Sequence, residues 1–201
     1  MSAPVWMANP VFASLLAEYR TRYPEVRLDI DLSGRLVNLV EEGFDLALRA
    51  TFAPDPGLIA RPICEIAFHL VGAPTYFERA GRPKSMADLQ GRELLAYSLF
   101  RPDGQIPFPG PDGPRTVKFN PVLQSANESL LHLAAVQGLG LGFLPMWLVR
   151  EDLAAGRLEL LLPESVAMRI QLFAVYPSRK YLSAKVRTFL DFLSKNPSFE
   201  T

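Results

Sequence analysis

Apolar side chains recur at helical spacing near the start of the chain, directly after an Asn-Pro pair. Asn9 is a typical N-cap and Pro10 suits the first helical position, so the pattern predicts a helix over residues 10–23. The apolar positions on one face of this helix are Val11, Phe12, Leu15, Leu16, Tyr19 and Tyr23. Pro24 then ends the helix, because its ring removes a backbone donor.

The spacing of apolar residues changes after this helix. Residues 26–32 alternate between apolar and polar side chains, which predicts a half-buried strand. Residues 35–42 return to helical spacing and precede Gly43, so a second helix with a glycine cap is predicted. Residues 44–49 indicate another strand. This alternation of strands and helices, with short connections, predicts a parallel sheet with crossover helices.

The middle of the chain carries strand patterns separated by turns. Residues 58–72 form a long apolar and β-branched stretch, which predicts a strand leading out of the first lobe. A short helix is predicted over residues 86–89 and a strand over residues 94–97. Residues 101–121 are rich in proline and glycine. They indicate a hairpin or an irregular loop, because proline cannot donate to a sheet ladder.

Two more helices are predicted in the second half of the chain. Ser125 and Glu128 have the spacing of a capping box, which opens a helix that Gly138 ends. A last helix begins after Ser183. Its apolar face holds Val186, Phe189, Leu190 and Leu193. The strands predicted between these two helices cover residues 139–144 and 169–176.

Composition narrows the class of protein. Lys and Arg number 21, as do Asp and Glu, so the formal net charge is zero and nucleic-acid binding by this chain itself is not expected. The single cysteine, Cys64, allows no intrachain disulfide and fits a reducing cytosol. The N-terminus does not have a signal-peptide pattern, and the apolar stretch 138–149 is shorter than the ~20 residues that a membrane helix needs. A cytoplasmic protein without membrane contact is expected.

The patterns that usually indicate catalysis have structural explanations. The glycines at 138, 140 and 142 follow a helix and precede a strand, which is the reverse of a dinucleotide-binding loop. The two histidines, His69 and His132, are not part of a cluster with metal-ligand spacing, and Cys64 has no histidine near it in sequence. We therefore expect no metal, no cofactor and no enzymatic activity.

Six phrases of the chain resemble, in their order and spacing, the effector-binding domain of LysR-type transcriptional regulators. They are SAPV at 2–5, YPEVRLDIDLS at 23–33, LVNLVEEGFDLALR at 36–49, GRPKSMADLQG at 81–91, GLGLGFLPMWLVREDLAAGRLELLLP at 138–163 and FAVYPSRKYLSAKVRTFLDFL at 173–193. The resemblance covers nearly the whole chain. Each phrase alone is weak evidence, but together they are specific.

The resemblance implies an α/β fold with two lobes, similar to a type 2 periplasmic binding protein. Each lobe would be a mixed sheet flanked by helices, and two crossover strands would join the lobes. The first lobe would comprise residues 1–68 and 175–201, and the second residues 69–174. The family's winged helix-turn-helix would precede SAPV and is absent from this sequence, so DNA binding is expected only through that missing N-terminal domain.

By this resemblance, the chain is expected to bind a small metabolite in the cleft between the lobes and to dimerise. A free-standing solute-binding protein is the alternative with the same fold. An enzyme would need a titratable cluster at the cleft. The loops there offer mainly arginine, hydroxyl and aromatic side chains, which suit binding better.

Candidate ligand-binding residues follow from the position of the strand ends. In open α/β sheets, ligands lie beyond the carboxyl ends of the strands and near helix N-termini, and effectors of LysR-type relatives contact the same loops. The residues selected in this way are Pro4, Val5, Trp6, Ser33, Gly34, Arg35, Arg49, Ala50, Thr51, Tyr97, Ser98, Ser125, Ala126, Asn127, Phe143 and Pro145.

The chemistry of these residues suggests an effector that carries a carboxylate. Arg49 and Arg35 can clamp a carboxylate, and Trp6 and Tyr97 can supply flat walls. Each has a structural alternative: Arg49 can pair with Asp45 or Glu42, Arg35 can be solvated, and Trp6 can be core. Ser33 and Ser125 can serve first as helix caps.

The resemblance also implies a homodimer or higher oligomer in which first and second lobes pair head to tail. The helix at 10–23 and the strand at 26–32 would then pack near the helix at 127–137 of a second chain. Tyr19, Leu28 and Leu131 would fit such a surface, although each can also belong to the core.

Overall fold

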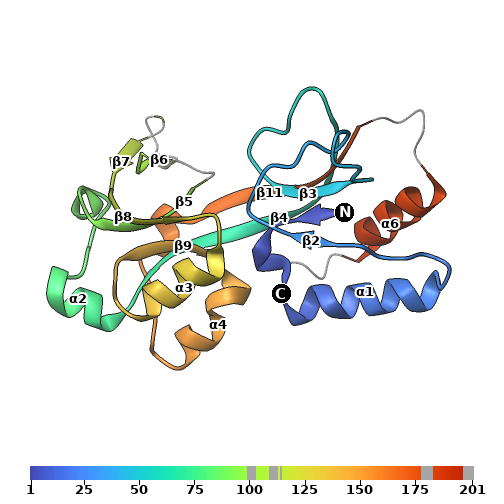
Figure 1. The fold of residues 1–201 in the computed structure, drawn as a ribbon. Helices are drawn as coiled ribbons and strands as arrows, with labels where there is room; N and C mark the ends of the chain where they lie inside the picture. The colour runs from blue at the N-terminus through green and yellow to red at the C-terminus, as the bar shows by residue number, and fades with distance from the viewer. Residues whose placement is uncertain (99–102, 109–112, 114, 178–182, 197–201) are drawn as a thin grey trace. The chain divides into compact units, whose positions relative to one another are not determined.

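A computed structural model of the chain describes residues 1–98, 103–108, 113, 115–177 and 183–196. The chain divides into two compact units, which we name unit 1 (Met1–Ile66 with Ile170–Thr201) and unit 2 (Ala67–Arg169). It passes from unit 1 to unit 2 within β4 (Ile59–Gly72) and returns in β11 (Met168–Tyr176), as Figure 1 shows.

Unit 1 is built on a mixed sheet in the order β2-β1-β3-β11, with β4 next to β11. The short strand β1 (Ser2–Ala3) pairs in parallel with both β2 (Asp31–Leu32) and β3 (Ala47–Ala50). The predicted parallel sheet is therefore confirmed for these three strands. The returning strand β11 pairs antiparallel with β3, so the sheet as a whole is mixed.

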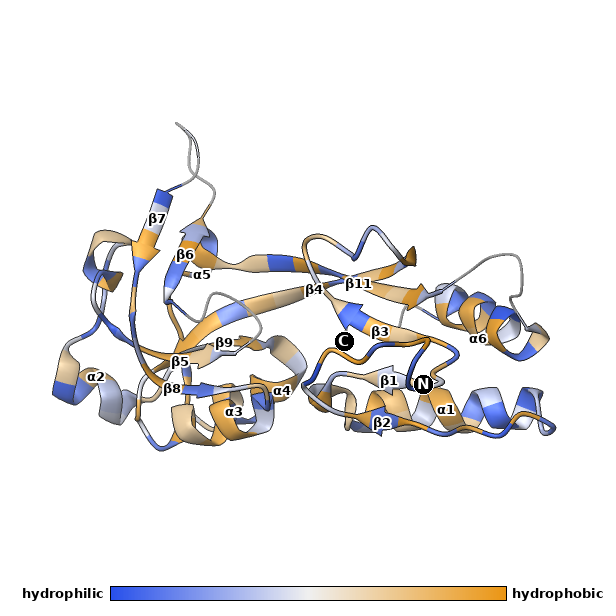
Figure 2. Ribbon diagram, turned by 45° about the horizontal axis from the view of Figure 1, so that its top comes forward, coloured by the Kyte–Doolittle hydropathy of each residue, from blue (hydrophilic) through white to orange (hydrophobic). Residues whose placement is uncertain are grey.

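The helix α1 (Pro10–Arg22) begins as predicted, because the Asn9 side chain accepts a hydrogen bond of 2.9 Å from the Phe12 N–H. It meets the last helix, α6 (Ala184–Lys195), at Tyr19. The Tyr19 ring is fully buried with its centroid 4.9 Å from that of Phe189, and its hydroxyl lies 2.9 Å from the Thr188 hydroxyl. In Figure 2, α6 is hydrophobic along one side only, as its sequence predicts.

Two elements predicted in unit 1 are wrong or shorter than expected. Residues 35–42 form a bend and a turn instead of a helix: Leu39 is buried, but Leu36 and Val40 are 72% and 70% exposed, so the apolar face that predicted a helix is not covered. Residues 26–30 alternate in burial as predicted, but only β2 joins a ladder, where it pairs with Ser2 and Ala3 of β1.

Unit 2 contains a sheet in the order β4-β9-β5-β8, and β10 (Glu159–Leu160) pairs with β4. The strand β5 (Glu93–Tyr97) is parallel to both β8 (Asn120–Ser125) and β9 (Leu141–Pro145). Because parallel strands end at the same side, the residues after Tyr97, Ser125 and Pro145 share one edge of the sheet.

The proline-rich segment forms a hairpin, one of the two predicted possibilities. Its strands, β6 (Gln105–Phe108) and β7 (Arg115–Lys118), pair antiparallel. Residues 99–102, 109–112 and 114 of this segment lie outside the described residues. The hairpin packs on the sheet through aromatic rings, since the Phe108 and Phe119 centroids lie 5.8 and 6.2 Å from that of Phe143.

The helices of unit 2 surround this sheet. They are α2 (Pro74–Ala80), the short turn η2 (Ala87–Leu89), α3 (Glu128–Val136), α4 (Met146–Ala154) and α5 (Pro163–Val166). Buried Leu131 and Ala135 of α3 pack with Val149 of α4 in one apolar cluster. The predicted capping box is wrong: α3 begins at Glu128 with Asn127 as its N-cap, so Ser125 lies two residues before the N-cap position.

A polar pair on α3 and α4 holds the two helices together. The buried Asp152 carboxylate lies 2.5 Å from His132 Nε2 and accepts a hydrogen bond of 2.5 Å from Arg157 Nε. Burial raises the pKa of Asp152, but the hydrogen bonds from Arg157 and His132 outweigh burial and hold the pKa below its usual value. His132 thus has a structural partner in Asp152.

We expect Asp152→Asn to lower the free energy of unfolding by about 1.5–3 kcal/mol at neutral pH, since charge-assisted hydrogen bonds to a buried group are lost. The pKa of Asp152 is lower in the folded protein than in the unfolded chain, so the ionised carboxyl stabilises the folded protein at pH values above the unfolded-state pKa. The difference in stability between wild type and variant should therefore disappear as the pH falls through the folded-state pKa of Asp152. Urea unfolding at several pH values measures it. Glu151→Gln, on the exposed side of α4, is the matched control, and equal losses in both variants would contradict the assignment.

Candidate functional site

The predicted residues of unit 1 gather at the carboxyl edge of its parallel strands. The 3-10 turn η1 (Val5–Met7) follows β1, residues 33–35 follow β2, and Thr51 follows β3. The Ser33 N–H donates to the Ala3 carbonyl at 3.1 Å, which ties two of these loops together. The sequence therefore identified side chains that the fold brings to one edge of unit 1.

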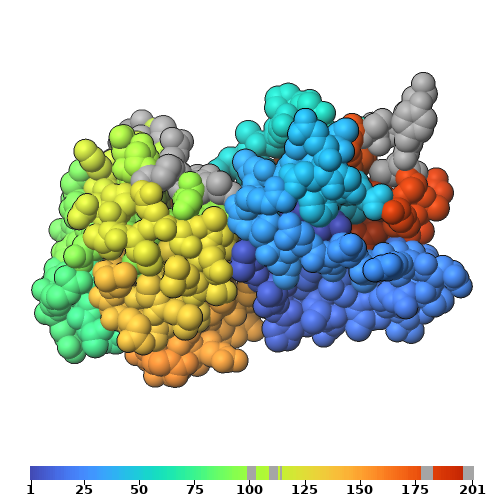
Figure 3. Space-filling model, in the orientation of Figure 1, coloured from blue at the N-terminus to red at the C-terminus, as the bar shows by residue number. Residues whose placement is uncertain are grey.

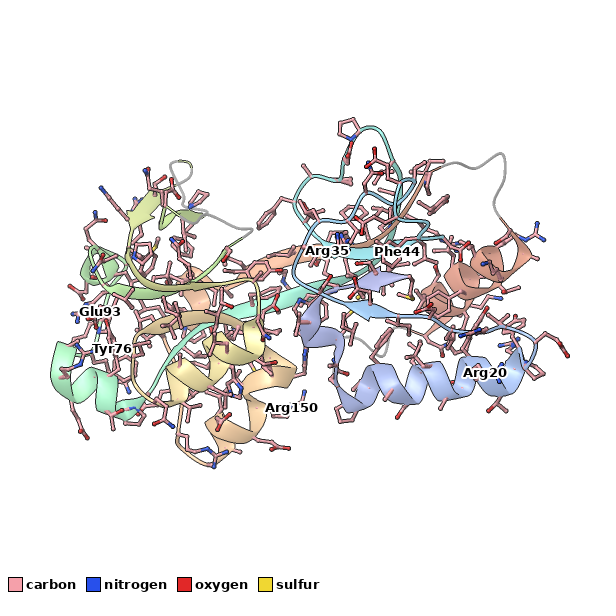
Figure 4. The ribbon with its side chains drawn as sticks, in the orientation of Figure 1. Arg20, Arg35, Phe44, Tyr76, Glu93 and Arg150 are labelled. Atoms are coloured by element: carbon pink, nitrogen blue, oxygen red, sulfur yellow. The ribbon has the colours of Figure 1, made fainter. Side chains whose placement is uncertain are left out.

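The two arginines at this edge differ in their surroundings. Arg35 is 58% exposed and forms a bidentate pair with Glu42, which is the solvated alternative (Figure 4). Arg49 is half-buried, and its guanidinium donates to the Leu48 carbonyl at 2.9 Å and to the fully buried Ser2 hydroxyl at 3.1 Å. Arg49 is thus the arginine whose position the fold fixes.

The carboxylates considered as partners of Arg49 have other partners. Glu42 pairs with Arg35, and Asp45 accepts a hydrogen bond of 2.6 Å from Lys185 Nζ. Trp6, proposed as a flat wall, is 4% exposed and lies in the core of unit 1. The Thr51 hydroxyl donates to the Ala53 carbonyl within its own turn.

The predicted residues of unit 2 lie at the shared edge of β5, β8 and β9. The Ser98 N–H donates to the Ser125 carbonyl at 3.0 Å, which joins two loops. Pro145 is buried at the start of α4. Phe143 packs against the aromatic rings of the hairpin, whereas its neighbour Leu144 belongs to the cluster under α3. Phe143 therefore points to the opposite face of the sheet from α3.

The first N–H groups of α3 are already occupied. The Asn127 side chain accepts from the N–H groups of Ser129 and Leu130 at 3.0 and 3.2 Å. The Ser125 hydroxyl accepts from the Asn127 N–H at 3.0 Å. Asn127 and Ser125 therefore act as caps, and the N–H groups of Asn127, Ser129 and Leu130 are already bonded within the turn instead of being free for an anion.

Sequence reasoning treated Glu128 only as a cap and missed that it is a buried carboxyl at the start of α3. Its side chain is 4% exposed on the buried face of α3. Burial raises the pKa of the Glu128 carboxyl to about 7, although hydrogen bonds from its own backbone N–H and from Tyr97 favour the charged form. The sequence did contain a signal for this burial: Glu128 shares one helical face with the apolar residues Leu131 and Ala135.

Other chemistry is limited in the part of the chain that the structure describes. Among those residues, no group of three or more His, Cys, Asp and Glu side chains is placed to hold a metal ion. No helix among the described ranges has the length and apolar character needed to cross a membrane. Cys64 is half-buried in β4, where its carbonyl accepts a hydrogen bond of 2.7 Å from the Gln171 amide.

Comparisons with a family model and with related proteins indicate the same family for this chain. The model of the LysR substrate binding domain matches residues 1–197. The HTH-type transcriptional regulator CrgA of Neisseria meningitidis is 32% identical over 189 residues, which are 93% of this chain and 62% of that protein. DmlR of Escherichia coli is 33% identical over 184 residues, 91% of this chain and 60% of that protein. The chain thus spans somewhat less than two thirds of these relatives.

Solved structures agree with the fold. The CrgA regulatory domain superimposes with a TM-score of 0.78 at 30% identity, covering 97% of this chain and 96% of that one. The effector domain of AmpR from Pseudomonas aeruginosa has a TM-score of 0.76 at 18% identity, covering 98% and 94%, which is evidence of fold alone. The expected α/β fold of the type 2 periplasmic-binding-protein class is confirmed.

Glu128→Gln is expected to remove a pH dependence of stability. The pKa of Glu128 is higher in the folded protein than in the unfolded chain, so the folded protein binds the proton more tightly. As the pH rises from 4.5 to about 7, the unfolded chain loses this proton first, and the free energy of unfolding therefore falls over this range. Between pH 5 and 8 the wild type should lose about 2.5 kcal/mol more than the variant. Urea unfolding of both in a Trp6→Phe background, where Trp147 of α4 reports on unit 2, measures the difference. Parallel pH profiles would contradict the prediction.

Proposed function

Because the chain belongs to the LysR substrate-binding domain family, we propose that it is the effector-binding and dimerisation domain of a LysR-type transcriptional regulator. The proposed effector is a small metabolite with a carboxylate, bound in the cleft between the two lobes of this fold. The observation that carries this proposal is the gathering of the predicted loops at the carboxyl edge of the parallel strands in each unit.

Arg49 is the residue proposed to bind the carboxylate. It stands near the carboxyl end of β3, and the buried Ser2 hydroxyl fixes its guanidinium. A fixed guanidinium binds a carboxylate with a smaller loss of side-chain entropy than a mobile one. Arg35 is a weaker candidate because Glu42 already neutralises it.

Regulation would follow from a difference in affinity. An effector that binds one arrangement of the lobes better than another shifts the population towards the first arrangement. The proposal assigns DNA binding to a helix-turn-helix segment outside this chain, since the related regulators are longer and are HTH-type proteins. The zero net charge of the chain supports that division of roles.

Dimerisation is proposed through two surfaces, one on each unit. In unit 1, an apolar groove of about 440 Å³ runs between α1 and β2, lined by Phe12, Leu16 and Ile30 among others. In unit 2, the outer faces of β8 and α3 carry Val122, Leu130 and Leu133, which are 40%, 48% and 60% exposed. Figure 3 shows the yellow atoms of this region at the surface. Tyr19 and Leu131, suggested earlier for this interface, are core residues.

Arg49→Ala is expected to abolish the thermal stabilisation that a metabolite library produces in the wild-type chain. A bound ligand stabilises the folded chain by a free energy that grows with the logarithm of the ligand concentration divided by Kd, and loss of a charged contact costs about 1.5–3 kcal/mol of binding. Arg35→Ala is the matched control and should respond almost as the wild type does. If a metabolite raises the melting temperature of Arg49→Ala as much as that of the wild type, Arg49 does not bind its carboxylate. If no metabolite raises the melting temperature of the wild type, the result counts against the effector-binding role.

Leu133→Asp is expected to shift the chain from dimer to monomer, since it buries an unpaired charge in the proposed interface. Light scattering over a concentration series measures the mass. Leu139→Asp is the control, because Leu139 is 45% exposed in the turn after α3. A wild-type chain that remains monomeric at high concentration would refute the dimer.

A further inference from the structure

Glu128 is a buried acidic residue at the binding edge of unit 2. It is the first residue of α3 and lies beside the shared carboxyl edge of β5 and β8. It shares the buried face of α3 with Leu131 and Ala135, which belong to the apolar cluster of unit 2. A carboxyl in such a place costs free energy unless a partner compensates its charge.

The hydrogen bonds of this carboxyl are incomplete. Tyr97 and the backbone N–H of Glu128 bond to it, whereas Oε2 has less than 1 Å² of accessible surface and does not form a hydrogen bond with any described residue. Buried polar atoms are nearly always bonded, so an orphaned oxygen at a ligand edge indicates a missing donor. Tyr97 is itself half-buried, which places the carboxyl just beneath the surface of this edge.

The described residues around Glu128 do not supply a positive charge. The elements packed on α3 are β5, β8, β9 and α4. The titratable groups on them and on α3 are Glu93 and Tyr97 of β5, His132 of α3, and Arg150, Glu151 and Asp152 of α4. His132 is bound to Asp152, Glu93 pairs with Arg79 at the other end of β5, and Arg150 and Glu151 are exposed. Within the described residues, the pKa of Glu128 is therefore set by burial and by the two hydrogen bonds rather than by a charged partner.

We propose that Glu128 is a specificity-determining residue that receives a protonated amine of the effector. Buried carboxylates are normally paired with a cation. In the described part of unit 2 the donors at the start of α3 are engaged, so the group that this edge can still accept is a cationic donor rather than a second anion. This inference rests on the proposed effector-binding function and adds an amine to the chemistry of the effector.

The proposal has a thermodynamic signature that a structural role lacks. An ammonium group pairs with the ionised carboxyl, so binding must lower the pKa of Glu128 from about 7 and release a proton. A carboxylate placed there would do the opposite. Each unit by which the pKa falls corresponds to a tenfold preference of the amine for the ionised form.

The test uses three probes with one ring and different head groups: benzylamine, N-benzylacetamide and benzoate. They are titrated into the intact chain labelled with ¹³C-glutamate, and the Cδ resonance of Glu128 is followed over pH by NMR. That resonance is assigned by its loss in Glu128→Gln. The resonance of Glu151, assigned in the same way with Glu151→Gln, is the control for an exposed glutamate.

Benzylamine should move the Glu128 resonance and lower its pKa by about one unit, while the other two probes leave both unchanged. An equal response to benzoate or N-benzylacetamide, an equal response of Glu151, or no response to any probe would overturn the proposal. Carboxylate binding that depends on Arg49 but leaves Glu128 unchanged would overturn this inference alone. A metabolite screen without hits would instead count against the proposed function.

Discussion

Parallel pairing of short strands is the constraint on which the rest of this structure depends. In unit 1 a strand of two residues, Ser2–Ala3, orders β2 and β3 beside it. In unit 2, β5 does the same for β8 and β9. Parallel strands begin and end together, so the loops that follow them must meet at one edge. Polar side chains that are far apart in the sequence are thereby brought close together. Helices such as α1, α3 and α6 cover the faces of the sheets.

Local capping limits what these edges can bind. A helix start is often an anion site because its N–H groups are unpaired. In α3 the Asn127 side chain and the Ser125 hydroxyl are used within the turn, so that role is reduced. At the edge of unit 1, Glu42 pairs with Arg35, while the Leu48 carbonyl and the Ser2 hydroxyl hold the guanidinium of Arg49. Local hydrogen bonds therefore decide how each of these groups is oriented at its edge.

Two buried carboxyls in unit 2 show how partners decide ionisation. Asp152 and Glu128 are 7% and 4% exposed, so burial penalises the charged form of both. Asp152 has His132 and Arg157 as partners, and its pKa falls. Among the described residues Glu128 has Tyr97 and its own N–H as partners, and its pKa rises to about 7. The first carboxyl therefore stabilises the packing of α3 on α4, whereas burial favours the protonated form of the second.

The sequence by itself determined the helices α1 and α6, the long strand β4, the parallel pairing in unit 1 and the family, because these follow from periodicity, caps and extended motifs. It also located the loops at the strand ends. Only the tertiary structure decided that residues 35–42 are turns, that Asn127 and not Ser125 caps α3, and that Glu128 is buried. Those outcomes depend on which neighbours a side chain meets. The spacing of residues along the chain does not predict these contacts, because Ser2, a partner of Arg49, and Tyr97, a partner of Glu128, lie far away in sequence on other elements.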